Sequence, residues 1–309
     1  MLKTRFLLLF IFIAGTLVKG QTTTAYDFMN LDVNPRAAVI GGGFIANYDD
    51  PNVIFYNPAG ISSLENRPIS FSFLNHIEEI KTVSLAYSQE FEGIGRFAVG
   101  VQYIGYGDFV RADNFGNKLG SFSAGDLAFT LGYSNQLDEN FYYGVNVKFI
   151  NSSIDDVSSS AIAADLGLQY LIPDKKLSFG FSVQNIGAQI TKYFDTEEDL
   201  PLDIRVGASK ELAHLPLRFY VSLNRLNDED DRFKSFSLGS EFKLSKVLRL
   251  RLGYDSDKRE DWKLGSASAG LAGFSIGLGV VVKKYNVDYA YSSMGEIGGW
   301  HRIGITTDI

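Results

Sequence analysis

The 309-residue chain contains no cysteine. It therefore forms no disulfide, offers no thiolate ligand to a metal, and has no cysteine that could carry a lipid anchor after an export leader. Histidine is scarce as well, with three in the chain, and no GxSxG elbow, HExxH motif or P-loop is present. These absences predict a protein that is not an enzyme and that has no cofactor and no resident metal. A serine–histidine–acid triad stays open as an alternative, because its members meet in space and not in sequence.

Positive charge is in deficit. Removing Lys3, Arg5 and Lys19 with a predicted leader leaves 26 basic residues against 36 acidic ones, a net charge of −10. A nucleic-acid-binding protein needs a basic face, so the composition excludes this class of partner. Paired acids such as Asp155–Asp156, and the run from Asp228 to Asp231, fall in predicted loops, where bound calcium is the alternative to plain solvated charge.

A hydrophobic run that reads as a transmembrane helix is also missing. The chain opens with a positive segment at Lys3 and Arg5, followed by an apolar stretch over residues 6–14. This stretch is too short to span a bilayer, so residues 1–20 are predicted to be a cleaved export signal. Residues 264–282 carry no charge, but five glycines and the alternation in their second half predict a strand there.

Most of the chain consists of short, aromatic-rich segments in which apolar and polar side chains alternate. Residues 202–209, for example, place Leu202, Ile204 and Val206 on one face and charged or small residues on the other. Fourteen strands are predicted, an even number, as a bacterial barrel requires for both chain ends to face one side. They lie at residues 69–75, 80–91, 94–106, 122–136, 140–153, 158–172, 177–187, 202–213, 216–226, 233–244, 247–256, 270–283, 285–293 and 301–308.

The connections between these strands differ in length according to the end at which they lie. Connections that follow even-numbered strands are tight turns, such as the one at Ser245 and Lys246. A soluble β-sandwich shows the same alternation but has no reason to segregate loop lengths in this way, whereas an outer-membrane barrel has short periplasmic turns and long extracellular loops. We therefore predict an all-β fold, a 14-stranded antiparallel transmembrane β-barrel in the cell outer membrane. Most of the other connections are longer, at residues 107–121, 188–201, 227–232, 257–269 and 294–300.

Charged side chains recur on one predicted face of several strands. A charge that faces lipid near the bilayer midplane costs about 2–4 kcal/mol. This face is therefore predicted to line a wet lumen in which the charges pair with one another or with water. Its members are Asp203, Arg205, Arg218, Glu241, Lys243, Arg249 and Arg251.

The segment that precedes the first predicted strand contains DDPNVIFYNPAG at residues 49–60. It resembles the N-terminal hatch signature of the FadL-like outer-membrane barrels. LDVNPRAAVIGGG at residues 31–43 is similar to the start of the PorV/PorQ family of the type IX secretion system, as are residues 277–293 and 301–307 near the other end. The compact length favours the PorQ branch. The chain ends on Asp308 and Ile309, whereas many outer-membrane barrels end on an aromatic residue.

Three parts are predicted along the chain: a signal peptide at residues 1–20, a plug or hatch segment at 21–66 and the barrel at 67–309. In the hatch motif, Pro58 fixes φ and Asn57 can bond its own backbone, while Ala59 and Gly60 permit close packing. Asn57, Pro58, Ala59 and Gly60 are therefore predicted to form a rigid turn in the barrel. A purely structural role and the gating of a hydrophobic ligand are the two alternatives for this turn.

For function, the resemblance implies a PorQ-like scaffold that anchors the attachment complex of type IX secretion at the cell surface. The implied partners are a PorZ-like lipopolysaccharide-recognising protein, a PorU-like sortase and a PorV-like barrel, in contact with outer-membrane lipid and lipopolysaccharide. The alternative is a FadL-like transporter of long-chain hydrophobic compounds, which needs an apolar lumen, and a third hypothesis is a secreted soluble β protein. Aromatic and charged residues of the long loops are predicted to dock the partners, namely Phe109, Arg111, Phe115, Tyr193, Phe194 and Trp262.

Overall fold

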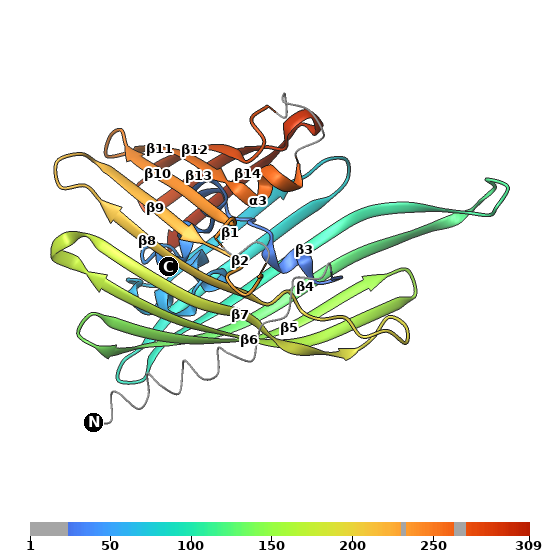
Figure 1. Ribbon diagram of the computed structural model, residues 1–309, viewed down its shortest axis with the longest axis horizontal. Helices are drawn as coiled ribbons and strands as arrows, with labels where there is room; N and C mark the ends of the chain where they lie inside the picture. Colours follow the sequence, from blue (N-terminus) through green and yellow to red (C-terminus); the bar gives the residue numbers. More distant parts are fainter. Residues whose placement is uncertain (1–23, 230–232, 263–269) are drawn as a thin grey trace.

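The computed structural model describes residues 24–229, 233–262 and 270–309, and these form a closed antiparallel barrel of 14 strands (Figure 1). Each strand pairs with its neighbour in the sequence, and β1 closes the barrel against β14, with Phe71 opposite Ile305. The predicted fold class and strand number are therefore confirmed. The strands are β1 (Pro68–Asn75), β2 (Lys81–Phe91), β3 (Gly95–Ala112), β4 (Lys118–Asp138), β5 (Phe141–Ile154), β6 (Val157–Ile172), β7 (Leu177–Thr191), β8 (Asp203–Glu211), β9 (Leu217–Leu223), β10 (Phe236–Lys243), β11 (Leu248–Asp255), β12 (Phe274–Val282), β13 (Tyr285–Ser293) and β14 (Gly299–Asp308).

The side chains alternate across the wall as the sequence predicts. In β9, Phe219 and Val221 are exposed on the outer face, whereas Arg218 and Tyr220 are buried inside. The same period recurs in β12, where exposed Ile276 and Leu278 flank inward-facing Gly277. The outer face is therefore apolar and the inner face polar, which is the arrangement of a barrel that spans a bilayer.

The prediction of a loop at residues 107–121 is wrong. β3 and β4 continue through most of this region as a hairpin that projects far beyond the other strands (Figure 1). A shift in register between Gly105 and Asp108 marks the point where the hairpin leaves the wall. Both faces of this arm are exposed, so the one-sided alternation that identifies a wall strand is absent there, although the backbone pairing continues.

The predicted loop at 257–269 begins with a short helix, α3 (Ser256–Asp261), which the sequence analysis missed. The Asp255 side chain caps this helix by accepting hydrogen bonds from the backbone N–H groups of Asp257 and Lys258. Of the uncharged stretch at 264–282, the second half is strand β12 as predicted, and its first residues lie outside the described residues. The predicted signal peptide also lies outside them.

The residues between Thr24 and β1 form a chain of short helices that lies inside the barrel (Figure 1); we call this segment the plug. Three of its helices begin at an Asx–Pro pair, in which the side chain of Asn34, Asp50 or Asn57 accepts a hydrogen bond from the backbone N–H two or three residues later. Proline suits the first helical position, because a backbone N–H there has no acceptor within the helix and proline has no N–H to leave unpaired. The helices are η1 (Asp27–Asn30), α2 (Pro35–Ile40), η2 (Gly41–Ala46), η3 (Pro51–Phe55) and η4 (Pro58–Ser63).

The main hydrophobic core lies between the plug and the inner wall. Ile40, Phe44 and Ile54 of the plug are fully buried and share this core with Ala86 and Tyr220 of the wall. In the described part of the chain, no helix is long and apolar enough to cross a bilayer.

Candidate functional site: the plugged lumen

The plug touches the inner wall where the wall strands carry glycine. A Cβ added at Gly239 would lie 2.6 Å from Cα of Ile40, and one at Gly253 would collide with the carbonyl oxygen of Val39. The backbone of α2 therefore lies directly on the backbone of β10 and β11. Contact at this range leaves no space for a solute between plug and wall on this side.

The predicted hatch motif occupies the opposite part of the lumen and makes the same kind of contact. A Cβ added at Gly144 would lie 2.5 Å from the backbone nitrogen of Ala59, and one at Gly167 would lie 2.8 Å from the Pro58 ring. The Asn57 amide donates to the carbonyl oxygens of Ile45 in the plug and Leu168 in β6, at 2.9 and 3.1 Å. Asn57 therefore joins two plug turns to the wall.

Gly60, the last residue of the motif, fills a position with no room for a side chain. A Cβ there would lie 2.5 Å from Cγ2 of Val53 and 2.8 Å from the carbonyl oxygen of Asn47. The motif thus forms a closely packed turn between the plug and the wall. Whether it also gates a ligand stays a prediction.

Buried ion pairs hold the plug on the side of β10 and β11; we call this network the latch. Arg36 of α2 places its Nε 2.9 Å from Oε2 of Glu241, and Arg251 places its Nε 2.7 Å from the same oxygen. Arg251 also pairs with Asp288 at 2.6 Å. All four side chains are at most 8 % exposed, so each charge depends on its protein partners and not on water.

The latch continues toward the tight-turn end of the barrel through Asp49. This carboxylate lies 2.8 Å from both Arg36 and Arg218. Burial raises the pKa of Asp49, but the two guanidinium groups outweigh it and hold the pKa well below its usual range. The side chain is still 37 % exposed, so water screens part of this effect. The prediction that the lumen charges pair with one another is confirmed for these residues.

A cavity of about 390 Å³, which we call the loop-end cavity, opens at the long-loop end of the lumen, and residues of η1 form part of its lining. Its lining mixes carboxylates, basic groups and aromatic rings, and both tryptophans of the chain take part. The rings of Trp262 and Trp300 meet edge to face with centroids 5.8 Å apart, and His76 meets Trp300 at 4.6 Å. Burial lowers the pKa of His76 to about 4, so this histidine is neutral at pH 7.

Carboxylates of α3 also face this cavity. Burial raises the pKa of Asp257 to about 6, although Arg225 lies 3.3 Å away and opposes the shift. Burial likewise raises the pKa of Asp27 and of Asp261. No sequence pattern predicts this cavity, because no spacing motif links η1, α3 and Trp300 of β14.

The predicted docking residues do not form one cluster. Phe109 and Arg111 lie on the arm of β3, where Arg111 pairs with Asp155, and Phe115 at the tip is 90 % exposed. Phe194 is exposed in the connection between β7 and β8, whereas the neighbouring Tyr193 donates a hydrogen bond to Ser152 of β5. Trp262, by contrast, lines the loop-end cavity against Trp300.

Asp155, one of the acids for which calcium was the alternative, is therefore in an ion pair with Arg111. Residues 230 and 231 of the second acidic run lie outside the described residues. Within residues 24–229, 233–262 and 270–309, no group of three or more histidine, cysteine or acidic side chains is placed to hold a metal ion.

No family model matches the sequence, and no curated protein matches it. Solved structures of outer-membrane barrels do match the fold. The toluene transporter TodX of Pseudomonas putida superposes with a TM-score of 0.56 at 12 % identity, over 92 % of this chain and 98 % of that one. The protein has the FadL-like barrel fold.

Two further structures have the same fold. The toluene transporter TbuX of Ralstonia pickettii matches with a TM-score of 0.55 at 12 % identity, over 94 % of this chain and 97 % of that one. A FadL homologue of Pseudomonas aeruginosa matches with a TM-score of 0.55 at 11 % identity, over 93 % of this chain and 98 % of that one. Identities this low establish the fold and leave function open, as different functions occur on one fold.

Proposed function

We propose that this FadL-like barrel is a PorQ-like scaffold of the type IX secretion system, which anchors a surface attachment complex to the outer membrane. The similarity of residues 31–43, 277–293 and 301–307 to the PorV/PorQ family supports the proposal. The expected partners are a PorZ-like protein, a PorU-like sortase and a PorV-like barrel. No catalytic step and no cofactor are assigned to this chain.

The observation that carries the proposal is the way in which the lumen is filled. The latch of Arg36, Glu241 and Arg251 and the glycine contacts of the plug hold the plug against the wall. The cavities that adjoin the plug, of about 390, 320 and 190 Å³, are lined largely by charged and polar side chains. A conduit for long-chain hydrophobic compounds needs an apolar pocket beside the plug, and these cavities are poor candidates for one.

The β3–β4 arm supports a role in docking. Phe115, Val110 and Leu119 are exposed by 57 to 90 %, on a hairpin that stands clear of the barrel (Figure 1). Such side chains on a projecting arm suit contact with a protein outside the membrane. Lipopolysaccharide and membrane lipid are expected to surround the rest of the barrel.

The second candidate is a FadL-like transporter, and the structural comparisons favour it over the first. TodX and TbuX are named as toluene transporters, and a further matching structure, CymD, is named as a monoaromatic hydrocarbon channel. The plug of this chain lies at the place in the sequence where the FadL-like resemblance implies a hatch. This candidate requires the plug to move, because the present contacts leave no passage along β10 and β11.

One experiment separates the two candidates. In a strain that lacks the gene, surface display of secreted proteins and uptake of radiolabelled oleate and toluene are measured, with the wild-type gene returned as the control. The scaffold predicts lost display and normal uptake. Normal display with reduced uptake would overturn the scaffold in favour of transport, and a strain normal in both respects would remove both candidates.

A second arm of this experiment uses a variant in which an Asn-Gly turn replaces residues 109–122. Under the scaffold proposal, this variant reaches the outer membrane but does not restore display. Under the transport proposal, it restores uptake, because the arm lies outside the lumen. A control replaces the exposed pair Asp138–Glu139 at the opposite end of the barrel with Asn-Gly, and it is expected to restore the wild-type phenotype in either case.

A further inference from the structure

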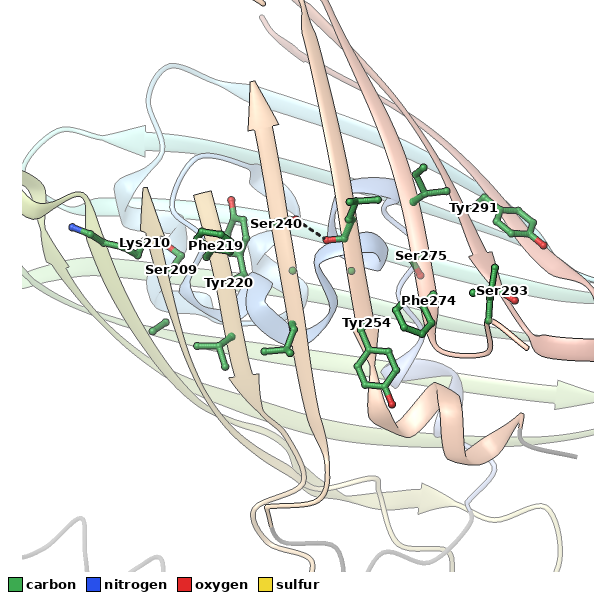
Figure 2. A pocket seen from close by; sticks show the side chains of 18 residues that line it. Ser209, Lys210, Phe219, Tyr220, Ser240, Tyr254, Phe274, Ser275, Tyr291 and Ser293 are labelled. Atoms are coloured by element: carbon green, nitrogen blue, oxygen red, sulfur yellow. Dashed lines mark hydrogen bonds between the residues drawn. The ribbon is translucent and has the colours of Figure 1, made fainter. Parts of the chain in front are cut away.

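The outer wall of the barrel is hollowed on one side. A groove of about 800 Å³ crosses the outer face from β8 to β13, as Figure 2 shows from outside the barrel. The lining is almost entirely apolar, and side chains from neighbouring strands form its sides. These are Phe219, Val221, Leu238, Leu252, Phe274 and Ile276.

The hollow lies where the plug touches the inner side of the wall. Gly239 and Gly253 lie at the floor of the groove, and on their inner side they touch Ile40 and Val39 of the plug. On the outer side, the floor carries the small residues Ala208 and Ser240. Small side chains outside and glycines inside thus make the wall thinnest where the plug lies against it. The Ser240 hydroxyl is satisfied within the wall, since it donates to the carbonyl oxygen of Leu252 at 3.3 Å.

The surroundings of the wall define what can fill the groove. The groove faces outward from a transmembrane barrel, so hydrocarbon is the adjoining solvent. Water is a poor occupant, because it needs two to four polar partners and the lining offers few. Leaving the groove empty forfeits the dispersion contacts of all its lining side chains. A hydrocarbon chain that lies along the groove recovers these contacts.

One end of the groove carries a positive charge. Lys210 faces outward from the tight-turn end of β8, opposite Phe219 in the register, and lines the groove (Figure 2). Its ammonium group donates to the carbonyl oxygen of Lys175 in the turn between β6 and β7, so the side chain reaches toward the membrane surface. Nearby Glu211 is occupied by Lys176 and Lys243, at 2.6 and 3.1 Å.

Lys210 itself keeps an uncompensated charge. Among the described residues, neither Lys210 nor Lys175 lies within ion-pair distance of a carboxylate. A phosphate group at the membrane surface supplies the missing negative charge. The groove and the lysine together therefore match the two ends of one kind of molecule, an apolar chain and an anionic headgroup.

We propose that the groove is a binding site for a phospholipid from the leaflet on the tight-turn side, with one acyl chain along β8–β12 and the headgroup phosphate at Lys210. The site depends only on the barrel spanning a membrane, and it is independent of whether the protein serves in secretion or in transport. Because the plug shapes the groove floor through Gly239 and Gly253, a lipid here contacts the same part of the wall as the latch.

The test is native mass spectrometry of the full-length mature barrel, released from vesicles of phosphatidylglycerol and phosphatidylethanolamine. The wild type is expected to retain one phospholipid. The double variant Ala208→Leu, Ser240→Phe fills the groove from the lipid side and is expected to retain at least about tenfold less, as lost burial of 1.4 kcal/mol implies. The control Ala164→Leu makes the same substitution as Ala208→Leu on the outer face of β6, where it opposes Val147, and is expected to retain the lipid.

The headgroup half of the proposal is tested with Lys210→Gln and with the control Lys246→Gln at another tight turn. Lys210→Gln is expected to lose the preference for phosphatidylglycerol over diacylglycerol, which lacks the phosphate, while Lys246→Gln keeps it. Heat-modifiable gel migration confirms that each variant is folded. Equal lipid retention by the wild type and the double variant would overturn the proposal. A wild-type dimer that the double variant converts to a monomer would also overturn it, since the occupant would then be a second barrel.

Discussion

Arg36 of the plug and Glu241 of the wall face each other inside the barrel, with Nε 2.9 Å from Oε2 and with side chains that are only 6 and 2 % exposed. The two residues are 205 positions apart in the chain. Their pairing joins the N-terminal plug to strand β10 of the wall, and Arg251 shares the same carboxylate. Two buried guanidinium groups thus share one buried carboxylate, and each has a second acid, Asp49 for Arg36 and Asp288 for Arg251.

We expect Glu241→Gln to destabilise the barrel by about 3 kcal/mol, the lower end of the range for a broken buried ion pair, because Arg36 and Arg251 lose their shared carboxylate but keep Asp49 and Asp288. Urea unfolding of the detergent-solubilised protein measures the change. The matched control is Glu197→Gln, which breaks an exposed ion pair with Lys192 and is expected to cost less than about 1 kcal/mol. Equal effects of the two substitutions would show that the latch contributes no more than a surface pair.

Gly253→Ala is expected to displace the plug, because the added methyl group collides with the carbonyl oxygen of Val39. Overpacking of this kind costs about 1–3 kcal/mol. The measurement is ion conductance in planar bilayers, with a closed wild type and an increased open fraction in the variant. Gly105→Ala is the control, since its nearest neighbour would be Oη of Tyr103 at 3.4 Å, an ordinary contact. A closed Gly253→Ala barrel would contradict the plug contact.

The free energy of unfolding is expected to fall as pH rises through the pKa of Asp257. Its pKa is raised from 3.8 to about 6 in the folded protein, so the folded state binds the proton more tightly than the unfolded state does. The stabilisation that this proton contributes is fully present below pH 3.8 and is lost as pH rises through about 6, with an upper limit of about 3 kcal/mol. Asp257→Asn should remove this pH dependence, as measured by unfolding between pH 4 and 7.5. A wild type and variant with parallel pH profiles would show that Asp257 has an ordinary pKa.

Replacing residues 109–122 of the arm with an Asn-Gly turn is expected to change the stability of the barrel by no more than about 1 kcal/mol. The arm is exposed on both faces, and its ion pair to the rest of the barrel, between Arg111 and Asp155, is at the surface. Thermal unfolding in detergent checks this expectation. A large loss of stability would show that the arm stabilises the barrel. The variant that lacks the arm would then not test docking alone.

Much of the wall could be predicted from the sequence. The alternation in β9 and β12, and the tight turns between hairpins, depend on neighbouring residues alone, and these patterns led to the correct number of strands. The arm of β3 and β4 was taken as a loop for the same reason, because a hairpin that is wet on both faces has no alternation to detect. Helix α3 is short and lies in a predicted loop, and its capping residue Asp255 closes a strand.

Less of the candidate site could be predicted from the sequence. The Asx–Pro pairs at Asn34, Asp50 and Asn57 predict turns, but they do not say which wall strands those turns touch. Likewise, Trp262 was assigned to a docking surface, and no local pattern indicated that it meets Trp300 inside the loop-end cavity.

By itself, the sequence determined which side chains of each strand face lipid and which face the lumen, since the period of two is a property of the extended backbone. Only the tertiary structure decided that Gly253 receives the backbone of Val39, and that Glu241 lies between Arg36 and Arg251. The physical reason is that closure of the barrel and entry of the plug bring together residues that are far apart in the chain. Their distances depend on the register and position of the whole assembly, which no short stretch of sequence encodes.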